Sequence, residues 1–127
     1  MWLAIALALA VVRRRPSVFA LVLVADVAAD LLADLGKVLV HRHRPFVHQL
    51  GPSTATHSFP SGHSATSFAC AAVLASLAPR LRVPLYVLAV LITLSRLYNG
   101  DHYPLDVLAG AALGSIVAVV VLRVSRR

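Results

Sequence analysis

Residues 58–79 read SFPSGHSATSFACAAVLASLAP, a short polar start followed by a long apolar run. Pro60 and Ser61 stand just before the run, which is typical of a helix N-terminus. The first turn of a helix leaves backbone N–H groups unpaired, and the helix dipole adds positive potential there. Gly62 lets a ligand approach the backbone closely, and His63 supplies a group that exchanges a proton near neutral pH. The stretch therefore predicts a helix whose start can bind an anion.

The composition of the whole chain indicates a membrane protein. Of its 127 residues, 59% are hydrophobic and only 13% are charged, and the mean hydropathy is +0.82. A soluble domain of this size cannot bury so much apolar surface. The net charge of +7 comes from basic clusters between apolar runs, which fits membrane-flanking charge better than a nucleic-acid surface. We therefore expect residues 1–127 to form one all-α domain, an integral membrane helical bundle with no nucleic-acid partner.

Polar boundaries divide this domain into four full transmembrane spans and a short N-terminal apolar segment. The run at residues 1–12 extends only about 18 Å as a helix, short of the roughly 30 Å hydrocarbon core. We interpret residues 1–15 as the end of a truncated helix or as an interfacial segment. Residues 16–127 hold the four spans, at about 16–40, 61–78, 83–97 and 104–122.

A row of charged residues follows one side of the 16–40 helix. Asp26, Asp30 and Asp34, here called the aspartate stripe, recur every four residues, and Lys37 continues the same side. Because charge at bilayer depth is costly, we expect the stripe to face other helices or a wet cavity. We interpret Asp26 and Asp30 as structural residues, whereas Asp34 fits either local pairing with Lys37 or a functional role.

Other polar and small residues have simple structural interpretations. Cys70 is the only cysteine, so it forms no intrachain disulfide, and it is expected to be a small packing residue. His48 and His57 are interpreted as solvated loop residues. Gly110 and Gly114 form a GxxxG pair that fits either close internal packing or dimerisation, so the oligomeric state stays open.

The distribution of arginine predicts the orientation in the membrane. Under this helix count, one end of the bundle carries most of the basic residues, and the positive-inside rule places that end in the cytoplasm. The histidine-rich end is then extracytoplasmic. The basic end carries Arg13 to Arg15, Arg80, Arg82, Arg123, Arg126 and Arg127.

Three polar clusters fall at helix ends on the outer side. Because the helices alternate in direction, these ends meet. The clusters have the spacings K-x6-R-P, P-S-G-H and S-R-x5-H-x3-D. They comprise Lys37 with Arg44-Pro45, Pro60 to His63, and Ser95-Arg96 with His102 and Asp106.

Together the clusters supply the parts of a phosphate-transfer site. Three cations, Lys37, Arg44 and Arg96, surround one point and suit a multiply charged oxyanion. The carboxylate of Asp106, four residues after His102, can accept one ring N–H and leave the other nitrogen as a nucleophile. His63 is then available as a general acid. No set of carboxylates or cysteines makes a convincing metal site, and we expect no cofactor.

The three clusters resemble the tripartite signature of the type 2 phosphatidic acid phosphatase (PAP2) superfamily, with a match over residues 37–106. The resemblance implies that His102 forms a phosphohistidine, that Asp106 orients it and that His63 protonates the leaving group. It implies that the remaining signature residues hold the phosphoryl oxygens, namely Lys37, Arg44, Ser61, Gly62 and Arg96.

The resemblance also implies an activity and a location. The expected protein is a metal-independent membrane phosphatase acting on a lipid-linked phosphate monoester or pyrophosphate. Candidate substrates are phosphatidic acid, phosphatidylglycerol phosphate and polyprenyl (pyro)phosphate, and the sequence does not choose among them. The expected location is a bacterial cytoplasmic membrane, with the site on its extracytoplasmic side.

Several alternatives remain open at this stage. Membrane members of the superfamily typically have six spans, so the chain is also consistent with a truncated, non-catalytic protein that binds lipid phosphates. A lipid phosphotransferase would use the same site, whereas a vanadate-dependent haloperoxidase is disfavoured by the apolar spans. Taken singly, Lys37 and Arg44 fit interfacial cations, Ser61 an N-cap, and His102 with Asp106 a capping pair. One phosphate site explains all of them together.

Overall fold

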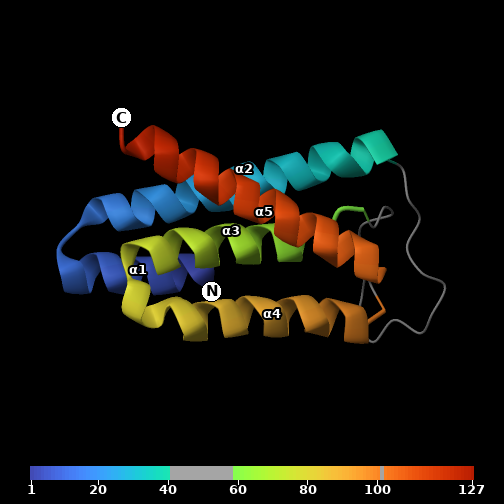
Figure 1. Cartoon of the computed structure of the whole chain (residues 1–127), viewed down its shortest axis with the longest axis horizontal. Coiled ribbons are helices and arrows are strands. Elements are labelled where there is room, and N and C mark those ends of the chain that lie inside the picture. Colours follow the sequence, from blue (N-terminus) through green and yellow to red (C-terminus); the bar gives the residue numbers. More distant parts are fainter. Residues whose placement is uncertain (41–58, 101) are drawn as a thin grey trace.

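The fold is an all-helical bundle in which successive helices run in alternating directions (Figure 1). The computed structural model describes residues 1–40, 59–100 and 102–127, and no strand occurs in these ranges. Five α-helices and one 3₁₀ turn make up this part of the chain. They are α1 (Trp2–Arg13), α2 (Pro16–Val40), α3 (Gly62–Leu77), η1 (Pro79–Leu81), α4 (Arg82–Tyr98) and α5 (Pro104–Ser125).

The helix boundaries follow the sequence signals closely. Pro16 and Pro104 each open a helix, as expected for a residue whose fixed φ suits the first turn. The expected turn at Asn99-Gly100 is present, and Gly100 has a positive φ of 74°. The helices expected at 61–78 and 83–97 differ from α3 and α4 by one residue at each end. The prediction of an all-α fold is confirmed for the described residues.

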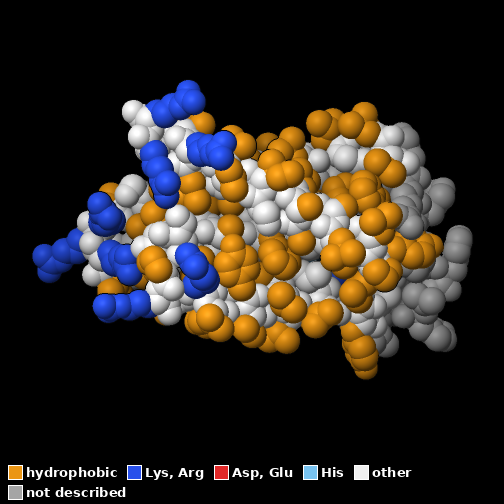
Figure 2. Space-filling view, in the orientation of Figure 1, with side chains coloured by type: hydrophobic (Ala, Val, Ile, Leu, Met, Phe, Trp, Pro, Cys, Tyr) orange, Lys and Arg blue, Asp and Glu red, His pale blue; other side chains and the backbone are white. Residues whose placement is uncertain are grey.

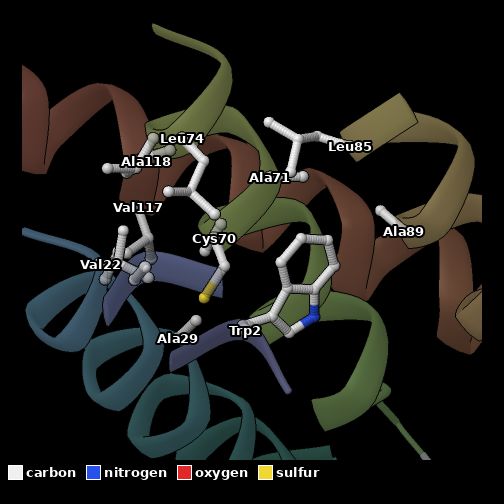
Figure 3. Packing of buried hydrophobic residues seen from close by; sticks show 14 of the residues in the cluster. Trp2, Val22, Ala29, Cys70, Ala71, Leu74, Leu85, Ala89, Val117 and Ala118 are labelled. Atoms are coloured by element: carbon white, nitrogen blue, oxygen red, sulfur yellow. The ribbon is translucent and has the colours of Figure 1, made fainter. Parts of the chain in front are cut away.

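Helix α3 lies at the centre and contacts all four other α-helices. Its sequence is rich in alanine and serine, and small side chains let neighbouring backbones approach closely. Figure 3 shows Cys70 and Leu74 of α3 near Val22 of α2 and Val117 of α5. Cys70 is fully buried, so the expectation of a packing residue is confirmed.

The two glycines of the GxxxG pair set the separation of α5 from α3. A Cβ on Gly110 would lie 2.5 Å from the carbonyl oxygen of Ser61, and one on Gly114 would collide with the carbonyl of Ala65. Only glycine allows backbones to pack this closely. The pair therefore serves internal packing, and it brings the first turns of α3 and α5 together.

The aspartate stripe lies at the edge of the packed face of α2 rather than on it. The buried positions of α2 are Val18, Val22, Ala25, Ala29 and Ala33. Each aspartate follows a buried alanine by one residue, about 100° further round the helix. Asp26 is half-buried, but Asp30 and Asp34 are exposed in the chain described. The expectation that the stripe faces other helices therefore holds in part. The Oδ1 of Asp26 accepts a hydrogen bond from the Sγ of Cys70 in α3 at 3.6 Å, and Asp30 reaches the start of α3, whereas Asp34 pairs with Lys37 of its own helix. Close packing against α3 reserves the centre of that face for alanine.

The surface suits a lipid environment. Large apolar side chains are exposed along α2, α4 and α5, including Leu31, Leu91, Leu108 and Ile116. Figure 2 shows apolar side chains spread along the face away from the basic end. Extended exposed apolar surface marks a region that contacts other apolar matter, such as a membrane. Within the described residues, two segments, Pro79–Tyr98 and Pro104–Ser125, are long and apolar enough to cross a membrane. These features are consistent with a membrane helical protein.

Candidate active site

The start of α3 is a capped helix end held against the start of α5. The Oγ of Ser61 accepts a hydrogen bond from the N–H of Ser64 at 3.3 Å, so Ser61 is the N-cap. The N–H of Ser61 donates to the carbonyl oxygen of Asp106 at 3.0 Å. Ser61 is fully buried, and Gly62, the first residue of α3, is buried as well. The simple interpretation of Ser61 as a cap is thus confirmed, and the same residue holds the start of α3 against the start of α5.

Lys37 brings a positive charge to this helix start from α2. A Cβ on Gly62 would lie 3.5 Å from the Nζ of Lys37 and 3.7 Å from an Oδ1 atom of Asp30. The ammonium group therefore sits beside the backbone of Gly62, where the dipole of α3 already favours an anion. The carboxylate of Asp30 also lies beside Gly62. The sequence predicts only a structural role for Asp30 and does not predict this contact.

Asp34 holds the side chain of Lys37 from the outer side. Its Oδ1 lies 3.1 Å from the Nζ, and the side chain of Asp34 is 60% exposed against 19% for Lys37. The predicted local pair is confirmed. An ion pair this close to solvent adds at most about 0.5 kcal/mol to stability, so its main effect is to direct the ammonium group.

His102 and Asp106 face each other at the start of α5. The Nδ1 of His102 lies 3.8 Å from the Oδ2 of Asp106, and both residues are buried, Asp106 completely. The same Oδ2 accepts a hydrogen bond from the N–H of Tyr103 at 2.7 Å, as part of a capping box. The cap therefore joins Asp106 to Tyr103 and not to His102, and the same carboxylate oxygen lies 3.8 Å from the ring nitrogen of His102, an ion-pair distance longer than a hydrogen bond. The Nε2 of His102 lies on the side of the ring away from Asp106.

A short hydrogen-bond chain ties α4 to this region. The hydroxyl of Thr93 lies 3.4 Å from the Oγ of Ser64, whose own hydroxyl donates to the carbonyl of Val107 at 2.7 Å. Sequence reasoning missed Ser64 and Thr93. The available signal was the presence of polar residues one turn from the signature residues, within otherwise apolar helices. These contacts join α3, α4 and α5 next to the candidate site.

The remaining signature residues lie at the same end of the bundle or outside the described ranges. Arg96 is half-buried in the last turn of α4, three residues beyond Thr93. His63 is exposed in the first turn of α3. Arg44 lies outside the residues that the structure describes, as do Pro45, His48 and His57. The structure therefore brings Lys37 beside Gly62, and it joins Ser61 to the backbone of Asp106, whose side chain faces His102. His63 follows Gly62 in the first turn of α3, and Arg96 lies in the last turn of α4.

The described residues contain no ready metal centre. No group of three or more histidine, cysteine, aspartate or glutamate side chains in the described ranges is placed to hold a metal ion. The positive charge that can face a bound anion comes from Lys37 and the backbone N–H groups at the start of α3, which are groups that bind phosphate in proteins, while Asp30 brings a carboxylate to the same place.

Comparison with known proteins gives concordant matches. A lipid A 1-phosphatase from Rhizobium johnstonii is 41% identical over 98 residues, covering 70% of this chain and 40% of that protein. An undecaprenyl-diphosphatase from Sulfolobus acidocaldarius is 31% identical over 123 residues, covering 92% of this chain and 60% of that protein. The crystal structure of Aquifex aeolicus LpxE matches with a TM-score of 0.79 at 30% identity, over 92% of this chain and 73% of that chain.

The family assignment rests on the whole length of the chain. The present chain spans 40% and 60% of the two curated relatives named above. The family model for the PAP2 superfamily, however, matches residues 1–127. The three clusters of the signature, the helical fold and the likeness to solved structures agree with this match. The chain belongs to the PAP2 superfamily.

Proposed function

We propose that this chain is a membrane phosphatase that hydrolyses a lipid-linked phosphate monoester or pyrophosphate through a phosphohistidine at His102. The observation that carries the proposal is the convergence of Lys37 and the α3 N-terminus at Gly62 with the buried His102–Asp106 pair. The hydrogen bond from Ser61 to the Asp106 carbonyl joins the two halves. Relatives named for lipid phosphates and diphosphates support a lipid substrate.

The first half of the reaction transfers the phosphoryl group to the enzyme. The lone pair on the Nε2 of His102 attacks phosphorus, and the bond from phosphorus to the leaving oxygen breaks. His63 gives its proton to that oxygen, which leaves as an alcohol or a phosphate. The carboxylate of Asp106 stabilises the positive imidazole ring of the phosphoenzyme, since its Oδ2 faces the opposite ring nitrogen at 3.8 Å.

The second half regenerates the enzyme with water. A water molecule gives a proton to His63 and attacks phosphorus, and the electrons of the N–P bond return to the ring of His102. Inorganic phosphate leaves. His63 is exposed, so its proton can be exchanged with solvent between cycles.

Basic side chains and backbone groups hold the phosphoryl oxygens during both steps. The ammonium group of Lys37 lies beside Gly62, the first residue of α3. The family signature assigns Arg44 and Arg96 to the residues that bind the phosphoryl oxygens, and Ser61 caps the start of α3. Preorganised positive charge of this kind stabilises the transition state of phosphoryl transfer without solvent reorganisation.

An apolar groove beside the site can take the hydrocarbon tail of the substrate. The groove has a volume of about 310 Å³ and lies between α3, α4 and α5, with Phe68, Leu94 and Leu108 among its lining residues. Thr93 and Val107, which also line it, belong to the hydrogen-bond chain through Ser64. A lipid whose headgroup is at His102 would therefore have its tail within reach of this groove.

We further propose that α2 and α3 cross the bilayer together with α4 and α5, and that the candidate site faces the extracytoplasmic side of a bacterial cytoplasmic membrane. The 25 residues of α2 are long enough to span it. The arginine-rich end, opposite the candidate site, supports this orientation through the positive-inside rule.

Phosphate release tests the proposal. Detergent-solubilised protein is incubated with phosphatidic acid, phosphatidylglycerol phosphate or a polyprenyl diphosphate, beside a His102→Ala variant. We expect release from at least one lipid and a loss of at least about 10⁴-fold in the variant. Absence of release from every lipid, by protein whose helical circular dichroism is intact, would favour a non-catalytic lipid-phosphate-binding protein. Transfer of phosphate to an added alcohol would indicate a phosphotransferase.

A further inference from the structure

A second groove lies at the end of the bundle opposite the candidate site. It has a volume of about 400 Å³ and lies where α1 turns into α2. Leu7, Val11 and Phe19 form its apolar wall, and Arg14 and Arg15 line it as well. Figure 1 shows that this turn and the starts of α3 and α5 are at opposite ends of the molecule. The groove is therefore separate from the phosphate site.

Backbone hydrogen bonds in the turn fix the main chain of Arg14 and Arg15. The backbone N–H of Arg14 donates to the carbonyl of Val11 at 3.1 Å, and that of Arg15 donates to the carbonyl of Ala10 at 2.9 Å. Arg13 makes a different contact. Its Nη1 donates a hydrogen bond to the carbonyl of Leu77 at 2.6 Å, which connects the turn to the end of α3. Arg14 and Arg15 are exposed, and both line the groove.

The charge around the groove has one sign. The first acidic residue of the chain is Asp26, so no carboxylate lies in the sequence of α1, of the turn or of the first part of α2. Figure 2 shows basic side chains gathered at this end of the molecule. An apolar wall next to uncompensated positive charge is complementary to a molecule with a hydrocarbon chain and an anionic head.

We propose that this groove binds one anionic phospholipid. Its acyl chain lies along Leu7, Val11 and Phe19, and its phosphate is bound by Arg14 and Arg15. Guanidinium groups bind phosphate oxygens through paired hydrogen bonds. A zwitterionic phospholipid has the same chain and phosphate, but its own cationic group cancels the charge that the arginines attract. Binding is therefore selective for anionic headgroups.

Native mass spectrometry of the full chain in detergent tests this proposal. The protein is titrated with phosphatidylglycerol or with phosphatidylcholine that has the same acyl chains, and the affinity for the first bound lipid is measured. We expect the double change Arg14→Gln, Arg15→Gln to weaken phosphatidylglycerol binding about 10- to 30-fold. The matched control, Arg126→Gln with Arg127→Gln, removes the same charge at the same end and should change binding by less than about threefold.

A second pair of variants tests the apolar wall without changing the charge. Val11→Trp fills the groove, whereas Val12→Trp places the same side chain on a neighbouring exposed residue that does not line it. We expect only Val11→Trp to weaken the first binding event. Equal effects of the two arginine pairs, equal binding of the two lipids, or unchanged binding in Val11→Trp would each overturn the proposal. These measurements report lipid binding and not catalysis, so they test this proposal independently of the phosphate-release assay with His102→Ala.

Discussion

The contact between α3 and α5 predicts a large effect of one added methyl group at Gly110. A Cβ there would lie 2.5 Å from the carbonyl oxygen of Ser61, whereas ordinary contacts begin at 3.4 Å. The Gly110→Ala change therefore requires α5 to move away from α3 by roughly 1 Å at the level of the candidate site. His102 and Asp106 move with α5, while Gly62 stays with α3.

The expected magnitudes follow from this displacement. Overpacking costs about 1–3 kcal/mol. The Ser61–Asp106 and Ser64–Val107 hydrogen bonds, at 3.0 and 2.7 Å, are worth about 1 kcal/mol each. Replacing glycine by alanine within a helix returns about 1 kcal/mol. A net loss of about 2–4 kcal/mol in stability is expected, and a misplacement of about 1 Å lowers turnover roughly 100-fold.

Two measurements on the same protein preparation check these numbers. Thermal unfolding in detergent reports stability, and phosphate release from the best lipid substrate reports turnover. Ala112→Val serves as the control, because it adds volume at an exposed position of α5. We expect the control to retain wild-type turnover within about twofold. If Gly110→Ala also keeps wild-type stability and turnover, the close contact does not position the site and the reasoning is refuted.

Further predictions concern the chemistry and the lipid tail. Asp106→Asn should lower kcat about 10²- to 10⁴-fold and leave KM nearly unchanged, because the amide stabilises the positive ring of His102 less well than the carboxylate does. An unchanged kcat would contradict the orienting role of Asp106. Orthovanadate should inhibit as a phosphate mimic, and Arg96→Ala should weaken this inhibition at least about tenfold; equal inhibition of the two proteins would remove Arg96 from the site. Chelating agents should leave phosphate release unchanged, and a strict requirement for added divalent metal would count against the mechanism. Ala111→Phe should fill the groove between α3, α4 and α5 and lower activity on long-chain lipids more than on short-chain analogues. The control Ala112→Phe should not change the ratio of the two activities. Equal effects of Ala111→Phe on both chain lengths would place the lipid tail elsewhere.

Much of the fold follows from local signals in the sequence. Pro16, Ser61 and Pro104 mark helix starts, and the Asn99-Gly100 turn separates α4 from α5. These signals act within one turn of the residue concerned, so they do not depend on tertiary structure. The position of α1, in contrast, depends on tertiary contacts. The indole N–H of Trp2 donates to the Oγ of Ser67 in α3 at 3.2 Å, a contact that no local pattern indicates.

The candidate site also combines features that the sequence predicts with features that depend on tertiary packing. The sequence predicts the pairing of His102 with Asp106, but His102 lies before the N-cap Tyr103, so the pairing depends on the turn that starts α5 and not on helical spacing. The approach of Lys37 to Gly62 follows from the order of the clusters and the alternating helices. Other features depend on how closely α2, α3 and α5 pack. These include the exposed position of Asp30 and the contact of the Asp106 carbonyl with Ser61. Sequence periodicity gives the side of a helix but not the width of the face that a neighbour covers.

The most direct test of the central claim is to trap the phosphoenzyme. Protein is mixed rapidly with a substrate carrying ³²P in the transferred phosphate, quenched in alkali, and digested for peptide mapping. We expect label on the peptide containing His102, stable in alkali and lost in acid as a phosphohistidine is, and absent from His102→Ala. Rapid turnover without any labelled peptide, or label that persists in His102→Ala, would contradict the assignment of His102 as the nucleophile.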